Sequence, residues 1–252
     1  MKYRTKSKKT MKKKINKIVS GTTLKDNAKY FMDNFLPPVL RDTRLYFFLV
    51  SRIYNSKVDP DFKKKVFYMS DDEFSEAYNE IAHSSMLISS NIDNYQINHV
   101  CSNVKGSSIL EIGAGNGELS LILARKGYEV TASDISVNNI NFINEKILGD
   151  NISVNTAIVN VEKIPYSDKS FDTVICLHTL EHVRNVTKAV SELKRVTKKR
   201  IIVIVPRERY FRYSINYHLN FFYGDEQLMF LFNLKRCRTV SKRTILSYIG
   251  DV

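Results

Sequence analysis

Short, almost wholly apolar runs alternate with longer amphipathic stretches from residue 107 onward. The runs are rich in β-branched residues and have the length of strands. Strands that are apolar at nearly every position are typical of a parallel sheet, which helices cover on both faces. The pattern predicts strands at Ser108 to Ile112, Tyr128 to Ala132, Ile152 to Val159, Phe171 to Leu177 and Ile201 to Val205.

The stretches between these runs have helical periodicity and helix-ending signals. One helix is expected from Asn116 to Lys126, stopping at Gly127, and the next from its N-cap Ser136 to Gly149. A third carries an apolar stripe that suits packing on a sheet. Because strand and helix alternate, the sequence predicts a doubly wound, Rossmann-like α/β fold. The stripe consists of Val183, Val186, Ala189, Val190, Leu193 and Val196.

The chain before residue 107 has a different character. Aromatic and aliphatic residues recur at helical spacing from residue 27 to about 100, with an interruption at Pro37-Pro38. Ser70, followed by acidic residues, is expected to be a helix N-cap. We therefore expect an N-terminal helical extension to the α/β core. The chain is expected to divide into a basic tail (1–20), a helical N-terminal cap (21–106) and the core domain (107–252).

The formal net charge is +13, and most of it lies at the start of the chain. The first twenty residues hold nine Lys and Arg and no acidic residue, which leaves 30 basic against 26 acidic residues elsewhere. Clustered cations suit nucleic acid or an anionic membrane surface. A solvated terminus is the alternative, and the sequence leaves both open.

Three features bear on location. No apolar stretch follows the lysines closely enough for a secretory signal, and the apolar run from Leu45 to Val50 is too short to span a bilayer. Cys101, Cys176 and Cys237 are widely spaced and form no C-x-x-C pair, so neither a disulfide framework nor a zinc knuckle is indicated. We therefore expect a cytoplasmic protein.

The sequence ILEIGAGNGE, residues 109–118, places three glycines directly after the first strand. Such a turn brings backbone N–H groups and the positive end of a helix to one point, which suits a nucleotide-like ligand. Gly113, Gly115 and Gly117 form G-x-G-x-G, whereas dinucleotide binding requires a third glycine where Glu118 stands. Because an acid there opposes a pyrophosphate, a phosphate-free ligand is favoured over a nicotinamide dinucleotide. A tight turn without a ligand is the remaining alternative.

Downstream segments narrow the ligand and the family. Asp134 ends the second strand, where a carboxylate accepts both hydroxyls of a ribose. It is followed in order by NVEKIP from Asn160, DKSFD from Asp168 and LEHV from Leu180. Over about residues 107–222 the chain thus resembles the class I S-adenosylmethionine-dependent methyltransferases. Within them it resembles the branch with the LEHV motif and is similar to ubiquinone-pathway O-methyltransferases.

The resemblance implies how S-adenosylmethionine is bound. The glycine loop and the preceding acid would face its methionine end, the acid of the second strand its ribose, and the end of the third strand its adenine. The end of the fourth strand would lie beside the cofactor. Asn160 stands where the family usually has Asp, so that adenine would meet a neutral acceptor. The implied cofactor-binding residues are Glu111, Gly113, Ala114, Gly115, Asn116, Gly117, Asp134, Ile135, Asn160, Val161, Leu177 and His178.

The segment HTLEH after the fourth strand holds the catalytic candidates His178, Glu181 and His182, because open α/β sheets bind ligands beyond the carboxyl ends of their strands. Its H-x-x-E-H spacing also occurs in a class of zinc proteases, but these require a helix and a further carboxylate ligand. The segment is similar to the E-x-x-E-H of ubiquinone-pathway O-methyltransferases and of small-RNA terminal ribose methyltransferases, which implies a divalent metal, although His178 replaces the first acid. The RNA enzymes use a later histidine as well, and His218 would supply it. A metal-free general base, or residues that satisfy the backbone at a helix start, are the other interpretations.

The acceptor is indicated only by class. Three arginines between residues 207 and 212 alternate with aromatics and suit phosphate or carboxylate, or else form a solvated loop. No N-P-P-Y or Pro-Cys motif of base methyltransferases is present, which favours an oxygen of a small molecule, glycan or lipid-linked acceptor. An RNA methyltransferase using the basic tail and a non-catalytic cofactor-binding module are the rivals. A helix from Gly224 to Asn233 and a hairpin would complete a seven-stranded, mostly parallel sheet.

Overall fold

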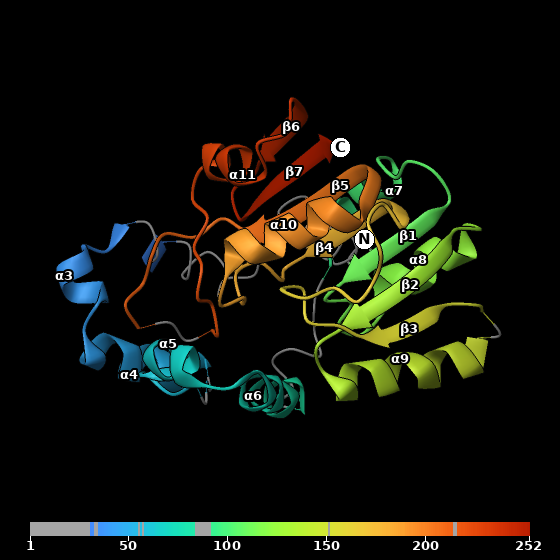
Figure 1. The fold of residues 1–252 in the computed structure, drawn as a ribbon. Coiled ribbons are helices and arrows are strands. Elements are labelled where there is room, and N and C mark those ends of the chain that lie inside the picture. The colour runs from blue at the N-terminus through green and yellow to red at the C-terminus, as the bar shows by residue number, and fades with distance from the viewer. Residues whose placement is uncertain are drawn as a thin grey trace, which may run out of the picture.

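Seven strands form one mixed sheet in the order β3-β2-β1-β4-β5-β7-β6 (Figure 1). The computed structural model describes residues 31–252 apart from 33–34, 55, 57, 84–91, 151 and 214–215. Strands β1 to β5 run parallel, and β7 is antiparallel to both β5 and β6. The predicted α/β class and the terminal hairpin are therefore confirmed. The strands are β1 Ser108–Ile112, β2 Glu129–Asp134, β3 Asn155–Ile158, β4 Phe171–Leu177, β5 Thr197–Pro206, β6 Arg236–Ser241 and β7 Ile245–Asp251.

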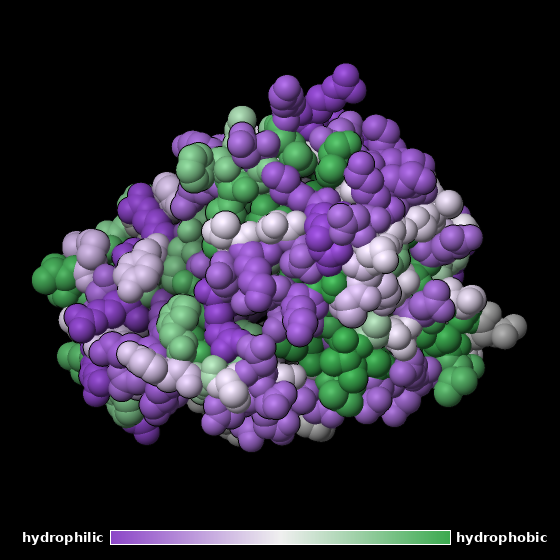
Figure 2. Space-filling view, in the orientation of Figure 1, coloured by the Kyte–Doolittle hydropathy of each residue, from purple (hydrophilic) through white to green (hydrophobic). Residues whose placement is uncertain are grey.

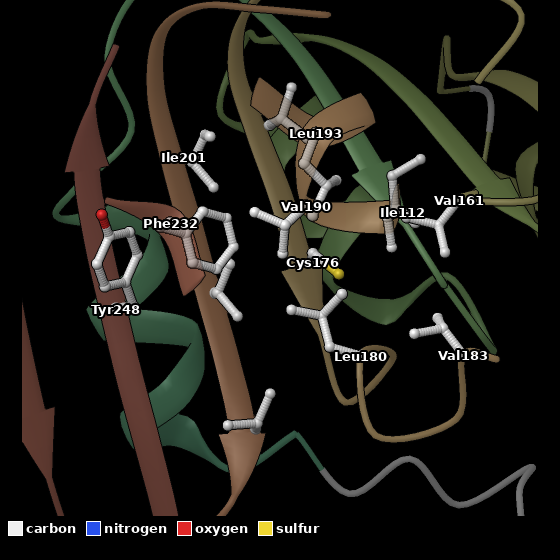
Figure 3. Packing of buried hydrophobic residues seen from close by; sticks show 14 of the residues in the cluster. Ile112, Val161, Cys176, Leu180, Val183, Val190, Leu193, Ile201, Phe232 and Tyr248 are labelled. Atoms are coloured by element: carbon white, nitrogen blue, oxygen red, sulfur yellow. The ribbon is translucent and has the colours of Figure 1, made fainter. Parts of the chain in front are cut away.

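Helices cover both faces of the sheet, because successive residues of a buried strand point to opposite sides. Leu110 and Cys176 pack with α10 and α11, whereas Ile109 and Ile175 pack with α7 and α8. Figure 3 shows the first of these cores, in which the ring of Phe232 lies against that of Tyr248 at a centroid distance of 4.6 Å. The helices are α7 Asn94–Cys101, α8 Glu118–Arg125, α9 Val137–Asp150, α10 Val186–Val196 and α11 Asp225–Phe232.

Element boundaries follow local capping more closely than hydrophobicity. Ser136 caps α9 as expected, since its Oγ accepts a hydrogen bond from the Asn139 N–H at 3.3 Å. Helix α10 begins only at Val186, because Asn185 is its N-cap. Val183 therefore lies in the preceding loop, where it is still buried. Strand β5 begins at Thr197, four residues before the predicted apolar run.

The described part of the N-terminal region is helical and leads to the carboxyl edge of the parallel strands. Ser70 forms a capping box with Glu73, as its hydroxyl accepts from the Glu73 N–H and the Glu73 carboxylate accepts from the Ser70 N–H. Phe62, Phe74 and Tyr78 pack with residues of the core domain. No described helix is both long and apolar enough to cross a membrane. The helices are α3 Pro38–Arg41, α4 Arg44–Tyr54, α5 Phe62–Lys65, the 3-10 turn η1 Val66–Tyr68 and α6 Asp71–His83; the basic tail, residues 1–20, lies outside the described residues.

Candidate active site

A cavity of about 420 Å³ opens at the carboxyl ends of β1, β2 and β4. Its walls come from the core domain, and helix α6 contributes Phe74 and Tyr78 on one side. This is the edge at which doubly wound sheets bind their ligands. Of the sequence-predicted site residues, those that line it are Gly113, Gly115, Asp134, Ile135, Asn160, Val161, Leu177, His178, Glu181, His182 and His218.

The glycine loop has a left-handed backbone at each glycine. The φ angles of Gly113, Gly115 and Gly117 are 72°, 54° and 74°, which side chains other than glycine rarely tolerate. A Cβ on Gly113 would lie 2.0 Å from Oγ1 of Thr179, so the loop and the end of β4 can approach only because this side chain is missing. Ala114, Asn116 and Gly117 belong to the turn but do not line the cavity.

Asp134 is fixed by the same loop. Its Oδ2 accepts a hydrogen bond from the Gly115 N–H and its Oδ1 from the Ser136 N–H, both at 2.9 Å. Burial raises the pKa of the Asp134 carboxyl, while these backbone N–H groups oppose the rise. The carboxylate is thus held rigidly at the cavity wall, with lone pairs left over for a ligand hydroxyl.

Glu111 lies outside the lining. Its Oε2 accepts a short hydrogen bond from Oγ of Ser120, and the side chain is buried inside the core. Burial raises the pKa of the Glu111 carboxyl to about 7. The structure therefore separates Glu111 from the loop residues with which it was grouped.

The adenine-side candidates, Asn160 and Val161, follow the end of β3. Asn160 uses its Oδ1 to accept from the Glu162 N–H at 2.9 Å, and so shapes the turn after β3. Glu162, which the sequence did not single out, also lines the cavity. Its Oε1 accepts from the N–H groups of Arg184 and Asn185 at 2.8 and 3.0 Å, and so connects this wall to the loop before α10.

The HTLEH segment lies in a turn, and the interpretation as helix-start residues is wrong. Glu181 and His182 are in the turn before the N-cap of α10, and the helix that the zinc-protease pattern requires is not formed there. Asn220 holds the turn against the segment after β5, because its side chain donates to the carbonyls of Leu180 and Val183 at 3.0 and 2.7 Å. That contact brings His218 to the turn.

The turn and the segment after β5 together place imidazole rings around the carboxylate of Glu181. Glu181 is 1% exposed; its Oε1 lies 3.6 Å from Nδ1 of His178 and 4.0 Å from Nε2 of His182. His218 completes the group, since one ligand atom each of Glu181, His182 and His218 lie within 4.8 Å of one another. The other carboxylate oxygen, Oε2, has no hydrogen-bond partner among the described residues.

In both His182 and His218 the ring nitrogen Nδ1 contacts an oxygen atom. Nδ1 of His182 lies 3.1 Å from the carbonyl oxygen of Tyr217, which can only accept, so this nitrogen carries the proton. Nδ1 of His218 is 2.7 Å from the Glu208 carboxylate, with the Asn216 amide also beside it at 2.9 Å. In the neutral tautomer Nε2 of His182 and Nε2 of His218 then carry a lone pair, which can accept a proton or bind a cation.

The electrostatics of this centre favour neutral imidazole and ionised carboxylate. Burial lowers the pKa of His182 to about 4, and the positive charge of His218 acts in the same direction. Burial alone would raise the pKa of the Glu181 carboxyl, but the imidazoles of His178, His182 and His218 around it lower this pKa overall. Acceptor atoms therefore converge on one point, which suits taking up a proton or holding a cation.

The arginines after β5 do not line the cavity. Arg207 stacks on the ring of Tyr223 and donates to its carbonyl at 3.0 Å, while Arg209 donates to its hydroxyl at 3.2 Å. Arg212 lies over Tyr213. This placement fits the alternative of a solvated, aromatic-packed loop.

Part of the chain is similar to known proteins. Residues 110–205 match the family model described as a methyltransferase domain. A ubiquinone biosynthesis O-methyltransferase of Rickettsia bellii is 37% identical over 97 residues, which are 38% of this chain and 40% of the relative. The chain thus aligns with less than half the length of the curated relatives it matches.

Solved structures share the fold. A SAM dependent methyltransferase from Aquifex aeolicus has a TM-score of 0.52 and 16% identity, over 73% of this chain and 99% of its own. The PH0226 protein from Pyrococcus horikoshii has a TM-score of 0.55 and 17% identity, over 68% and 98%. At sequence identities this low, the similarity shows a shared fold only.

Proposed function

We propose that the chain is an S-adenosylmethionine-dependent O-methyltransferase, because its residues 110–205 match the methyltransferase domain family model. The observation that carries this proposal is the cavity, in which the glycine loop and Asp134 share one space with the Glu181 and His182 centre. The acceptor proposed is a small molecule, a glycan or a lipid-linked compound. The Rickettsia relative, named for O-methylation, supports oxygen as the methylated atom.

Each wall of the cavity has a proposed task. Gly113 and Gly115 expose backbone to the methionine end, and Asp134 accepts the ribose hydroxyls. Asn160 and Val161 contact the adenine. When bound, the cofactor supplies a methyl group on a positively charged sulfur, which becomes a neutral thioether as the methyl carbon bonds to the acceptor oxygen.

The proton of the acceptor hydroxyl needs a destination, and His178 is the proposed base. Its side chain is 30% exposed, the more accessible of the two imidazoles beside Glu181. Its Nε2 contacts the Gln96 side-chain oxygen at 3.1 Å, which directs the free Nδ1 inward. Glu181 would then stabilise the positive charge that His178 acquires.

The residues present also fit the divalent ion that the resemblance implies. Glu181, His182 and His218 would hold it, since an unpartnered buried carboxylate oxygen and two oriented imidazoles are a suitable donor set. Such an ion would polarise the acceptor hydroxyl and lower its pKa. With two imidazoles and one carboxylate the set suits zinc-like ions better than Mg²⁺.

The experiment that tests this function measures cofactor binding and methyl transfer on the same variants. Asp134→Ala should weaken S-adenosylhomocysteine binding by about tenfold to a hundredfold, because hydrogen bonds to a charged group are lost. Calorimetry gives the affinity, and labelled methyl donor with acceptor extracts gives the turnover. Asp72→Ala, an exposed acid in the first turn of α6, is the matched control.

The outcomes separate the rivals. Cofactor binding without turnover on any extract would indicate a non-catalytic module. The nine basic residues among the first twenty favour RNA as a second acceptor class, which predicts labelled RNA and an affinity that falls steeply with salt. Absence of any S-adenosylhomocysteine binding by the unmodified protein overturns the proposal.

A further inference from the structure

Helix α4 presents an apolar face to solvent. Leu45, Phe48, Leu49 and Ile53 follow one another at steps of three, one and four, so they share one side of the helix. Their exposed fractions lie between 53% and 70%, whereas Phe47 and Val50 on the inner side are buried. In a surface helix that is apolar on both sides, the outer face leaves apolar side chains exposed to water.

The segment before α4 extends this surface. The rings of Phe31 and Phe35 stack at a centroid distance of 5.1 Å and are exposed, as are Val39 and Leu40 of α3. Figure 1 places α3 and α4 together at the left end of the molecule, away from the sheet, and Figure 2 shows apolar side chains there among polar ones. We call these eight residues the apolar shelf: Phe31, Phe35, Val39, Leu40, Leu45, Phe48, Leu49 and Ile53.

Positive charge adjoins the apolar shelf along the chain. The first twenty residues carry nine Lys and Arg without an acid, and ten residues separate them from Phe31. Arg44 and Arg52 lie on α4 itself, and the lysines of α5 follow. Arg44 is paired with Asp61, so the N-terminal segment supplies most of the unbalanced charge.

We propose that the apolar shelf docks on an anionic membrane surface, with residues 1–20 adding electrostatic attraction to its headgroups. Stable membrane attachment typically takes two signals, and an apolar helix face beside a polybasic segment supplies both. Nucleic acid would use the cations equally well. It would gain little from the exposed Leu, Ile and Val side chains, which lose water only in a lipid or protein environment.

Two basic residues next to the apolar shelf contact the loop after β5. Arg41, buried at the end of α3, donates to the carbonyl of Tyr210 at 2.8 Å and lies over the Phe211 ring. Lys63 of α5 donates to the Phe211 carbonyl in the same loop. The helices that carry the docking surface are therefore attached to the segment after β5.

Vesicle sedimentation tests the proposal on the full chain. Vesicles of phosphatidylcholine alone are compared with vesicles that also contain phosphatidylglycerol. The unmodified protein should sediment with the anionic vesicles and release at high salt. The double variant Phe48→Glu with Ile53→Glu should bind the anionic vesicles at least about tenfold more weakly than the unmodified protein. The reason is that each exposed apolar side chain that enters lipid raises the affinity by a factor of about this size.

Matched controls come from other exposed apolar residues. Leu148 on α9 and Phe230 on α11 are 85% and 86% exposed, and Leu148→Glu with Phe230→Glu should leave vesicle binding unchanged. Thermal unfolding of both double variants should match that of the unmodified protein. A drop for the α4 variant alone, with vesicle binding intact, would mean that the chain itself covers the apolar shelf.

Three further results overturn the proposal. One is equal vesicle binding by the α4 variant and the unmodified protein. Another is no vesicle binding together with salt-sensitive binding to an RNA oligomer. The last is a concentration-dependent dimer that the α4 variant dissociates, which would make the shelf an interface between two copies. None of these results bears on methyl transfer, which is measured separately.

Discussion

Glu111 is the residue whose environment departs furthest from its expected role. Its carboxyl is buried, raised in pKa to about 7, and bonded to Ser120. Because the unfolded chain ionises near pH 4.5 and the folded one only near 7, the folded state binds more protons between these values. The stability that Glu111 contributes is therefore complete below pH 4.5 and is lost as the pH rises to 7.

Glu111→Gln should accordingly stabilise the protein at alkaline pH. We expect its free energy of unfolding to exceed that of the unmodified protein by roughly 2–3 kcal/mol at pH 8, since the amide keeps the bond from Ser120 without a buried charge. Near pH 4.5 the difference should vanish. Urea unfolding at both pH values measures it, and a difference that is independent of pH would contradict the expectation.

At the residue scale, the sequence predicts the residues that line the cavity better than the residues that orient them. Asp134 and the glycines can be recognised in the sequence because they lie at the ends of apolar strands. Gln96 and Glu208, which fix the imidazoles of His178 and His218, carry no local signal. Gln96 lies 82 positions from its histidine, so only the folded chain shows the pair.

The glycine loop is an element whose shape depends on missing side chains. Gly113→Ala would place a methyl group against Thr179, whose hydroxyl donates to the Ile112 carbonyl at 3.2 Å. Because Gly113 also has a left-handed φ of 72°, we expect the substitution to lower the unfolding free energy by about 2–4 kcal/mol and to weaken S-adenosylhomocysteine binding. Chemical denaturation and calorimetry measure the two effects.

Gly149 provides the control for this substitution. It lies in α9, and an added Cβ there meets no atom within 4 Å. Gly149→Ala should leave cofactor binding unchanged and raise stability by up to about 1 kcal/mol, because alanine favours the helix. Equal losses in both variants would show that the close approach of the glycine loop to Thr179 is unimportant.

At the element scale, hydrophobic runs predict strands well where both faces are buried. Strands β1 and β4 match their predicted bounds. The start of β5 was missed because residues 198–200 are Lys-Lys-Arg and do not continue the apolar run. This polar segment nevertheless extends β5 alongside β4. Helix α10 was placed too early because Val183 continues its apolar stripe without being helical.

On the scale of the whole molecule, the N-terminal helices complete the site, although the boundaries of the proposed cap stay a prediction. Tyr78 of α6 donates to the carbonyls of His182 and Tyr217 at 3.1 and 3.3 Å. The sequence predicted helices here, but not that α6 would form a wall of the cavity. Contacts across more than a hundred positions depend on packing, which no periodicity encodes.

Arg184 is one of the polar attachments of α6 to the core. It pairs with Asp71, donates to the Met69 carbonyl at 2.7 Å and lies over the ring of Phe74 at 4.6 Å. Arg184→Ala should release α6 from the loop before α10. We expect faster amide hydrogen exchange in α6 and a higher KM for the acceptor, because the wall of the cavity would open more often.

Arg195→Ala distinguishes this opening from general destabilisation. Arg195 makes comparable contacts, with Glu192 and with the carbonyls of Ile164 and Tyr166, but none with the N-terminal helices. Its removal should lower the melting temperature without selectively exposing α6 amides. If exchange in α6 rose equally in both variants, α6 would depend on the stability of the core as a whole, and Arg184 would have no separate part in closing the cavity.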